Sequence, residues 1–168
     1  MTDTTPLLAP VVTLLDELTR GAPSEMCWVL NGGDPGLLAS LDRLTARQAG
    51  ALPANGGPTV AAHVNHLRYG LELLNRWEDG EENPFASADW AASWGRTSVD
   101  DGEWDLLRSE LRQRVERWRA SLASPRDTSG FALTGIVAAV VHIGYHMGAL
   151  RQIDRTLTGP EATPRVGA

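Results

Sequence analysis

The sequence predicts an all-α protein in which amphipathic helices pack into a bundle. Several segments repeat apolar residues at the three- and four-residue spacing of one helix face, and no segment alternates apolar and polar residues as a half-buried strand does. Stretches rich in glycine and proline separate these segments. At 168 residues, the chain is long enough to form one domain with a substantial core.

Two helices are expected in the first third of the chain. Residues 7–20 carry leucine and valine at helical spacing, and Gly21-Ala22-Pro23 ends that segment. A second helix is expected over residues 37–49, where leucines recur at helical spacing before Pro53. Asp34 is a suitable cap for this helix.

Three more helices are expected in the remainder of the chain. They are predicted over residues 59–78, 101–122 and 132–157, each with an apolar stripe. Residues 79–101 form an unusually long connection, and connections of this length in compact domains are mostly functional or wrap the fold. The tail over residues 159–168 is expected to be flexible.

Charge and cysteine content exclude some classes of protein. The net charge of −6 and the pI near 5.1 argue against a nucleic-acid binder, which normally presents a basic face. The single cysteine, Cys27, forms no intrachain disulfide, which fits a reducing compartment. We see no signal peptide and no run of 18 apolar residues. A cytoplasmic protein without a membrane span is therefore expected.

All four histidines lie on two of the predicted helices. His142 and His146 are four residues apart, about 40° from each other around the helix axis, so both can grip one metal ion. His66 lies on the helix over residues 59–78, and His63 points about 60° away from it. Facing helices of a bundle can aim side chains at one point. His66, His142 and His146 could then hold one divalent cation and leave positions open, as catalytic sites do.

Other residues near these histidines have two interpretations each. A buried histidine is commonly a hydrogen-bonded core residue rather than a ligand. Gly70, one turn after His66, either clears space for a substrate or allows close helix packing. Trp90 and Trp94 lie in the long connection and are candidates for the rim of a substrate pocket.

The two histidine segments resemble those of the DinB/YfiT-like metal-binding bundle superfamily. Residues 59–67 are similar to its first motif, in which His66 matches the ligand and His63 a neighbour that is not a ligand. Residues 142–153 are similar to its H-x-x-x-H motif, with Ala149 where relatives often have glutamine.

The resemblance implies an up-down-down-up four-helix bundle with an extra N-terminal helical segment. Residues 36–158 would form the bundle, and residues 1–35 an extension that packs on it. A three-histidine metal centre and a homodimer are also implied.

The resemblance further implies a class of chemistry. The metal would be zinc or nickel, with iron or manganese as alternatives. The leading function is transfer of a low-molecular-weight thiol (mycothiol, bacillithiol or glutathione) to an electrophile. The alternatives are a metal-dependent hydrolase and a non-enzymatic ligand-binding or stress-response module.

Overall fold

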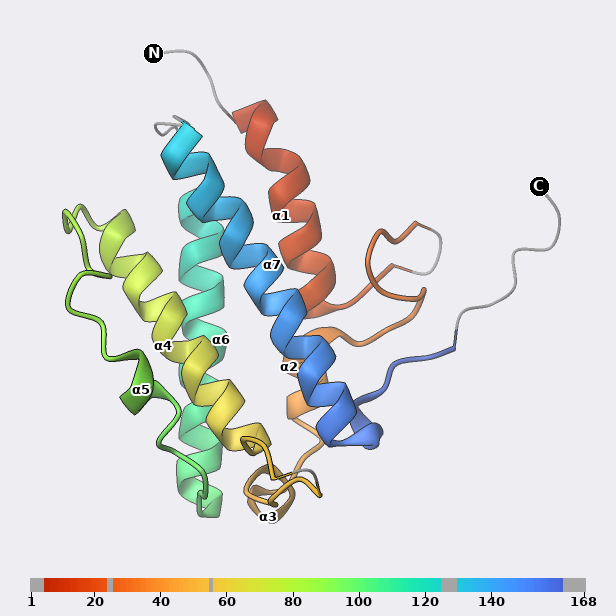
Figure 1. Ribbon diagram of the computed structural model, residues 1–168. Helices are drawn as coiled ribbons and strands as arrows, with labels where there is room; N and C mark the ends of the chain where they lie inside the picture. Colours follow the sequence, from red (N-terminus) through yellow and green to blue (C-terminus); the bar gives the residue numbers. More distant parts are fainter. Residues whose placement is uncertain (1–4, 24–25, 55, 125–129, 162–168) are drawn as a thin grey trace, which may run out of the picture.

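The computed structural model describes residues 5–23, 26–54, 56–124 and 130–161, and over these residues the regular structure is entirely helical. Four long helices lie side by side (Figure 1). They are α1 (Thr5–Arg20), α4 (Val60–Glu78), α6 (Asp101–Leu122) and α7 (Gly130–Ile153). The short elements are α2 (Gly36–Leu41), α3 (Ala46–Ala49), α5 (Trp90–Ser93) and a 3₁₀ turn, η1 (Arg155–Leu157).

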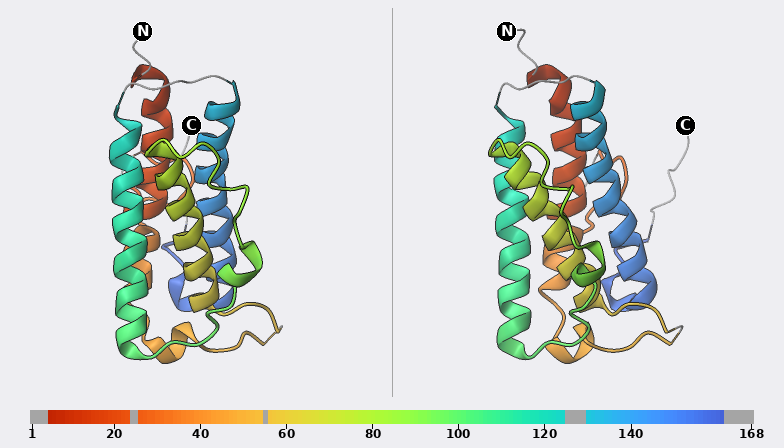
Figure 2. Two further views of the ribbon diagram at one scale, coloured as in Figure 1. Left: turned by 90° about the vertical axis from the view of Figure 1, so that its left-hand side faces the viewer. Right: turned by 60° about the vertical axis from the view of Figure 1, so that its left-hand side comes forward.

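The long helices follow the up-down-down-up order. Helices α1 and α7 run in one direction, and α4 and α6 run in the other (Figures 1 and 2). Because α4 and α6 are parallel and contact each other, the chain must return between them from one end of the bundle to the other. Residues 79–100 make this return along the outer side of α4 and carry α5 (Figure 2).

Helix α1 is one of the four long helices. Its side chains Leu8, Leu15 and Leu18 are buried in the same core cluster as Val64 of α4 and Ile143 of α7. The sequence predicts residues 1–35 as an extension that packs on the bundle. The apolar stripe of α1 packs against α6 and α7 along the bundle.

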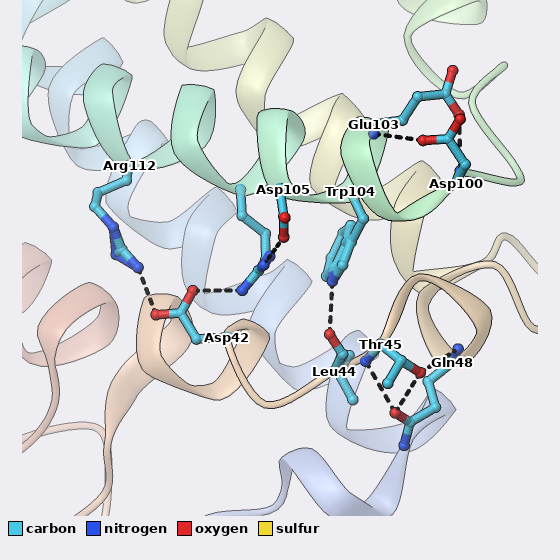
Figure 3. Close-up of polar contacts among 10 residues, drawn as sticks. Asp42, Leu44, Thr45, Gln48, Asp100, Glu103, Trp104, Asp105 and Arg112 are labelled. Carbon is cyan, nitrogen blue, oxygen red and sulfur yellow. Dashed lines mark hydrogen bonds and ion pairs between the residues drawn. The ribbon is translucent and has the colours of Figure 1, made fainter.

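The single helix expected over residues 37–49 is two short helices. Thr45 has an extended backbone and begins α3 with a capping box: its hydroxyl accepts from Gln48 N, and the Gln48 side chain accepts from Thr45 N at 3.0 Å (Figure 3). Trp104 of α6 donates its indole N–H to Leu44 O at 2.8 Å. The leucine period continues across this break, which is why the pattern alone predicts one helix.

Helix α6 separates its apolar and charged faces as its period predicts. One face is fully buried and includes Trp104 and Trp118. Beside this buried face, Arg108 and Arg112 donate to Asp42 at 3.0 and 2.6 Å, which ties α6 to the end of α2 (Figure 3). The Asp100–Glu103 capping box fixes the start of the helix after the long connection.

Helix α7 is the most apolar element of the bundle. Among the described residues, it is the one helix long and apolar enough to cross a membrane by length and composition. It contacts α1 and α4 along the bundle, as the core helix of a folded domain does. Its solvent-facing side carries Val137, Val141 and Tyr145.

A buried carboxylate joins α1 to the connection that follows it, and we expect it to matter for stability. Glu17 is 3% exposed and accepts from the backbone N–H groups of Trp28, Val29 and Leu30 at 2.6–2.8 Å. Glu17→Ala leaves these donors without an acceptor and should lower the free energy of unfolding by about 3 kcal/mol in urea titrations. Glu116→Ala, at an exposed ion pair, is the control and should change it by less than about 1 kcal/mol.

Candidate metal centre

Three histidine side chains meet between α4 and α7. His66 of α4 and His146 of α7 are buried, and His142 is half-buried one turn before His146. The Nε2 atoms of His66 and His142 are 3.3 Å apart, and those of His142 and His146 are 2.8 Å apart. All three ligand atoms lie within 4.8 Å of one another, so they could share one ion.

These distances fit a divalent ion bound by imidazole. Two nitrogens at roughly 2.0–2.1 Å from an ion are about 3.3 Å apart at a tetrahedral angle and about 2.9 Å apart at a right angle. The two measured separations match these values closely. Among the described residues no fourth His, Cys, Asp or Glu joins the group, so open positions would remain for another molecule.

Ser93 fixes which nitrogen of His66 is free. Its hydroxyl donates to Trp90 O at 2.6 Å, and its oxygen lies 2.7 Å from His66 Nδ1. The only hydroxyl proton is used on the carbonyl, so His66 Nδ1 must carry the proton that joins the two side chains. His66 Nε2 therefore presents a lone pair to the other histidines, as a metal ligand must.

His63 lies directly behind His146. Their Nδ1 atoms are 2.8 Å apart, so one proton is shared between them. If His146 donates it, His146 Nε2 also presents a lone pair, and His63 takes the role of an outer hydrogen-bond partner. The sequence predicts His63 as a neighbour that is not a ligand, and this hydrogen bond joins it to one of the predicted ligands.

Direct hydrogen bonds between the three histidines leave at least one of the meeting nitrogens without a donor. His66 Nε2 carries no proton, and at 2.8 Å His142 and His146 have room for one proton between their Nε2 atoms. A single N–H donor is then shared by three Nε2 atoms, and one hydrogen bond cannot satisfy both of the remaining lone pairs. A divalent ion would accept all of them at once, which favours a metal site over a purely hydrogen-bonded core.

The surroundings keep the cluster uncharged. Burial and, after it, the nearby His142, His63 and His66 together lower the pKa of His146 to about 3. Burial and, after it, His142 and His63 lower the pKa of His66 to about 4. Burial also lowers the pKa values of His63 and His142. Neutral imidazole is the form that binds metal, so the free site is already in its binding state at neutral pH.

Helix α5 holds two tryptophans against the histidines. The Trp94 ring stacks on His66 with centroids 4.1 Å apart and planes 19° apart. Asn65 and Tyr69 of α4 hold this segment: Asn65 Nδ2 donates to Ser93 O at 2.7 Å, and the Tyr69 hydroxyl accepts from Asp89 N at 2.9 Å. The long connection is therefore fixed on α4 directly beside the site.

A cavity of about 670 Å³ extends from the histidines along the α4–α7 groove. His142 is the member of the histidine cluster that lines it. Apolar side chains and glycines form most of the wall, and a Cβ at Gly70 would meet the Trp90 ring at 3.8 Å. The lining residues from α4 are Leu67, Gly70, Leu71, Leu74 and Trp77, and those from α7 are Phe131, Gly135, Ala138, Ala139, His142 and Ile143.

Residues 36–148 match the family model of the DinB superfamily, a stretch that contains all four histidines. The chain belongs to the DinB superfamily. No curated protein and no solved structure gives a significant match. Membership and the three-histidine cluster together fit a metal-binding helical protein.

The structure brings together most of the residues that the sequence singles out in this DinB protein. His66, His142 and His146 converge, and Gly70 and Trp90 line the cavity. Trp94 packs on His66 and is not among the described lining residues of the cavity. The assignment of the three histidines as ligands stays a prediction.

Ser93 and the far part of the cavity are not predicted by the sequence. Ser93 has no motif of its own, and its position beside the site depends on how residues 79–100 cross α4. Gly135 and Trp77 lie opposite each other on α7 and α4, where a Gly135 Cβ would be 3.5 Å from the Trp77 ring. A small residue on the histidine face of an apolar helix is the one signal that points toward such a cavity.

Arg151 has a different role from the one its position on the helix predicts. It lies opposite His142 around α7 and is expected to face solvent. Its side chain is 19% exposed and donates to both carboxylate oxygens of Asp34, which is 2% exposed. Arg151 therefore holds the connection after α1 against the end of α7 and takes no part in the site.

The lowered pKa values predict acid sensitivity of the metal-free protein. His66 and His146 titrate near 6.5 when unfolded but near 4 and 3 when folded, so the unfolded state binds more protons between these values. Their contribution to stability is full above about pH 6.5 and falls as the pH drops toward 4. Urea midpoints of the wild type and of His66→Asn, measured from pH 7.5 to 4.5, should show a smaller loss in the variant. An equal loss in both proteins would contradict the lowered pKa of His66.

The outer hydrogen bonds of the ligands predict their effect on metal affinity. His63→Leu and Ser93→Ala each remove a partner that orients a ligand ring, and each should weaken zinc binding by about ten- to hundredfold. Chelator competition measures this affinity. The matched control is Thr134→Ala, at an exposed position of α7 outside the site, which should bind zinc like the wild type. Unchanged affinity in both test variants would show that these contacts do not support the ligands.

Proposed function

We propose that this DinB protein is a divalent-metal enzyme that transfers a low-molecular-weight thiol to an electrophile. The observation that supports the proposal is the convergence of three Nε2 atoms at one end of a large apolar cavity. Imidazole ligands suit zinc, nickel and iron, and the proposal takes zinc or nickel as the metal, with iron or manganese as the alternatives. Mycothiol, bacillithiol and glutathione are the candidate thiols.

The chain supplies orientation and exclusion of water around the reacting groups. A divalent ion, when bound, supplies a positive charge that favours the thiolate form of the thiol. Ser93 and His63 hold the rings of His66 and His146, and Trp94 covers the face of His66. The apolar walls beside His142 would keep water from competing with the thiol for the electrophile.

The proposed reaction is a nucleophilic substitution. The thiol gives up its proton to solvent, and the sulfur uses an electron pair to form a bond to the electrophilic carbon. The bond from that carbon to the leaving group breaks, and the leaving group departs with its electron pair. With monochlorobimane as the electrophile, the products are the thioether and chloride.

Metal content tests the site without requiring any reaction. We expect protein purified without a histidine tag to bind about one divalent ion per chain, and His146→Ala to fall to background in elemental mass spectrometry. Thr134→Ala on the same helix is the control and should keep the wild-type content. Full metal content in His146→Ala would overturn the assignment of the three histidines.

Turnover tests the reaction class. The metal-loaded protein should accelerate thioether formation from monochlorobimane with at least one of mycothiol, bacillithiol and glutathione, and chelation should abolish the acceleration. No metal-dependent rate with any of the three thiols would overturn the transferase. Metal-dependent cleavage of p-nitrophenyl esters in the same samples would then favour the hydrolase.

The homodimer, the cytoplasmic location and the absence of nucleic-acid or membrane partners are proposals of the same kind. They rest on the resemblance and on composition, and they stay predictions. Gel filtration with light scattering would test the dimer directly.

A further inference from the structure

The cavity beside the histidines is elongated and has two chemically different ends. Its wall on α4 runs from Leu67 to Trp77, which spans about 15 Å at the rise of an α-helix. His142 lies at one end, and at the other end α4 gives way to the connection that carries Glu82 and Asn83. A volume of about 670 Å³ lies within the usual range for small-molecule sites.

The middle of the cavity is shaped by glycines beneath tryptophans. Gly70 lies beside the Trp90 ring, and Gly135 lies beside the Trp77 ring. A Cβ atom added to Gly70 would be 3.8 Å from the Trp90 ring, and one added to Gly135 would be 3.5 Å from the Trp77 ring. Side chains larger than glycine at these positions would meet the tryptophan rings. Both glycines lie inside long helices, where glycine is destabilising by roughly 1 kcal/mol relative to alanine. Their small size therefore has a structural use in the wall of the cavity.

The far end is aromatic and acidic. Trp77 contacts Phe85 and Phe131 edge-on, each with ring centroids 6.4 Å apart. Glu82 is the one charged residue among the described lining residues, and it is exposed. The nearest arginine on α4, Arg76, already pairs with Glu81 through two hydrogen bonds of 2.7 and 2.6 Å. Among the described residues that line this end, none is a cation that would attract an anion.

We infer that the cavity binds an elongated apolar molecule whose distal group is neutral or cationic. An alkyl chain or linked rings would lie along the glycine-lined wall, and the distal group would reach Glu82 and Asn83. The inference rests on the proposed function in one respect: the reactive carbon of the electrophile would lie at the His142 end. Fatty-acid-like anions are disfavoured by the charge at the far end.

Binding to metal-free protein tests this inference separately from catalysis. Metal is removed because an ion at the histidines would bind carboxylates directly. The fluorescent probe N-phenyl-1-naphthylamine should bind the full chain at one site, with micromolar affinity. Decylamine and decanol should displace it at least tenfold more effectively than decanoate, each below its micelle-forming concentration. Glu82→Gln should reduce the preference for decylamine over decanoate at least threefold.

Two glycines of α7 provide a matched pair of variants. Gly135→Leu fills the cavity and should weaken probe binding at least tenfold. In Gly148→Leu, the same change is made where an added Cβ meets nothing within 4 Å, and binding should be unchanged. If Gly135→Leu does not fold by circular dichroism, Ala138→Leu on the exposed rim of the cavity repeats the test.

The outcomes separate this inference from the proposed function. No saturable probe binding, or equal binding by the wild type and the cavity-filling variant, would overturn the inference whatever the turnover assays give. Preference for decanoate would overturn the assignment of the distal group. Probe binding with the expected preferences would support the inference even where no thiol reacts.

Discussion

Three histidine Nε2 atoms converge on one point between two antiparallel helices of the bundle. His66 and the His142/His146 pair come from antiparallel helices, so α4 and α7 must keep one register for the Nε2 atoms to lie 2.8–3.3 Å apart. Two outer hydrogen bonds, from Ser93 and His63, act on the opposite ring nitrogens. The free site is thus held in a neutral, electron-rich state that a folded core would not adopt for packing alone.

The long helices and the connection over residues 79–100 have different proposed roles at the site, because they are held in place by different contacts. The predicted ligands lie on long helices whose other faces are buried in the core, so their positions depend on the whole bundle. The tryptophans and Ser93 lie on the connection, which is tied to α4 by Asn65 and Tyr69. A ligand geometry fixed by the bundle can therefore be combined with a wall whose shape depends on a few local hydrogen bonds.

The sequence predicts the long helices and the shared face of His142 and His146 well, because both depend on periodicity. The apolar stripes of α4, α6 and α7 give their bounds to within a few residues, and the four-residue spacing places His142 and His146 on one face. Other features depend on contacts between distant segments. The break at Thr45 needs the Leu44 carbonyl to meet Trp104, and the Ser93 contact needs α5 to cross α4. Neither contact leaves a periodic signal.

The order of the helices has a consequence for the origin of the site. Two consecutive parallel helices oblige the chain to run the length of the bundle once without contributing a core helix. In this protein the returning segment crosses α4 beside His66. It places Trp90, Ser93 and Trp94 next to the histidine cluster. A segment that the topology requires as a link therefore also encloses the site. Because few of its side chains are buried in the core, this segment is where substitutions could alter substrate preference while leaving the helices and the ligand histidines in place.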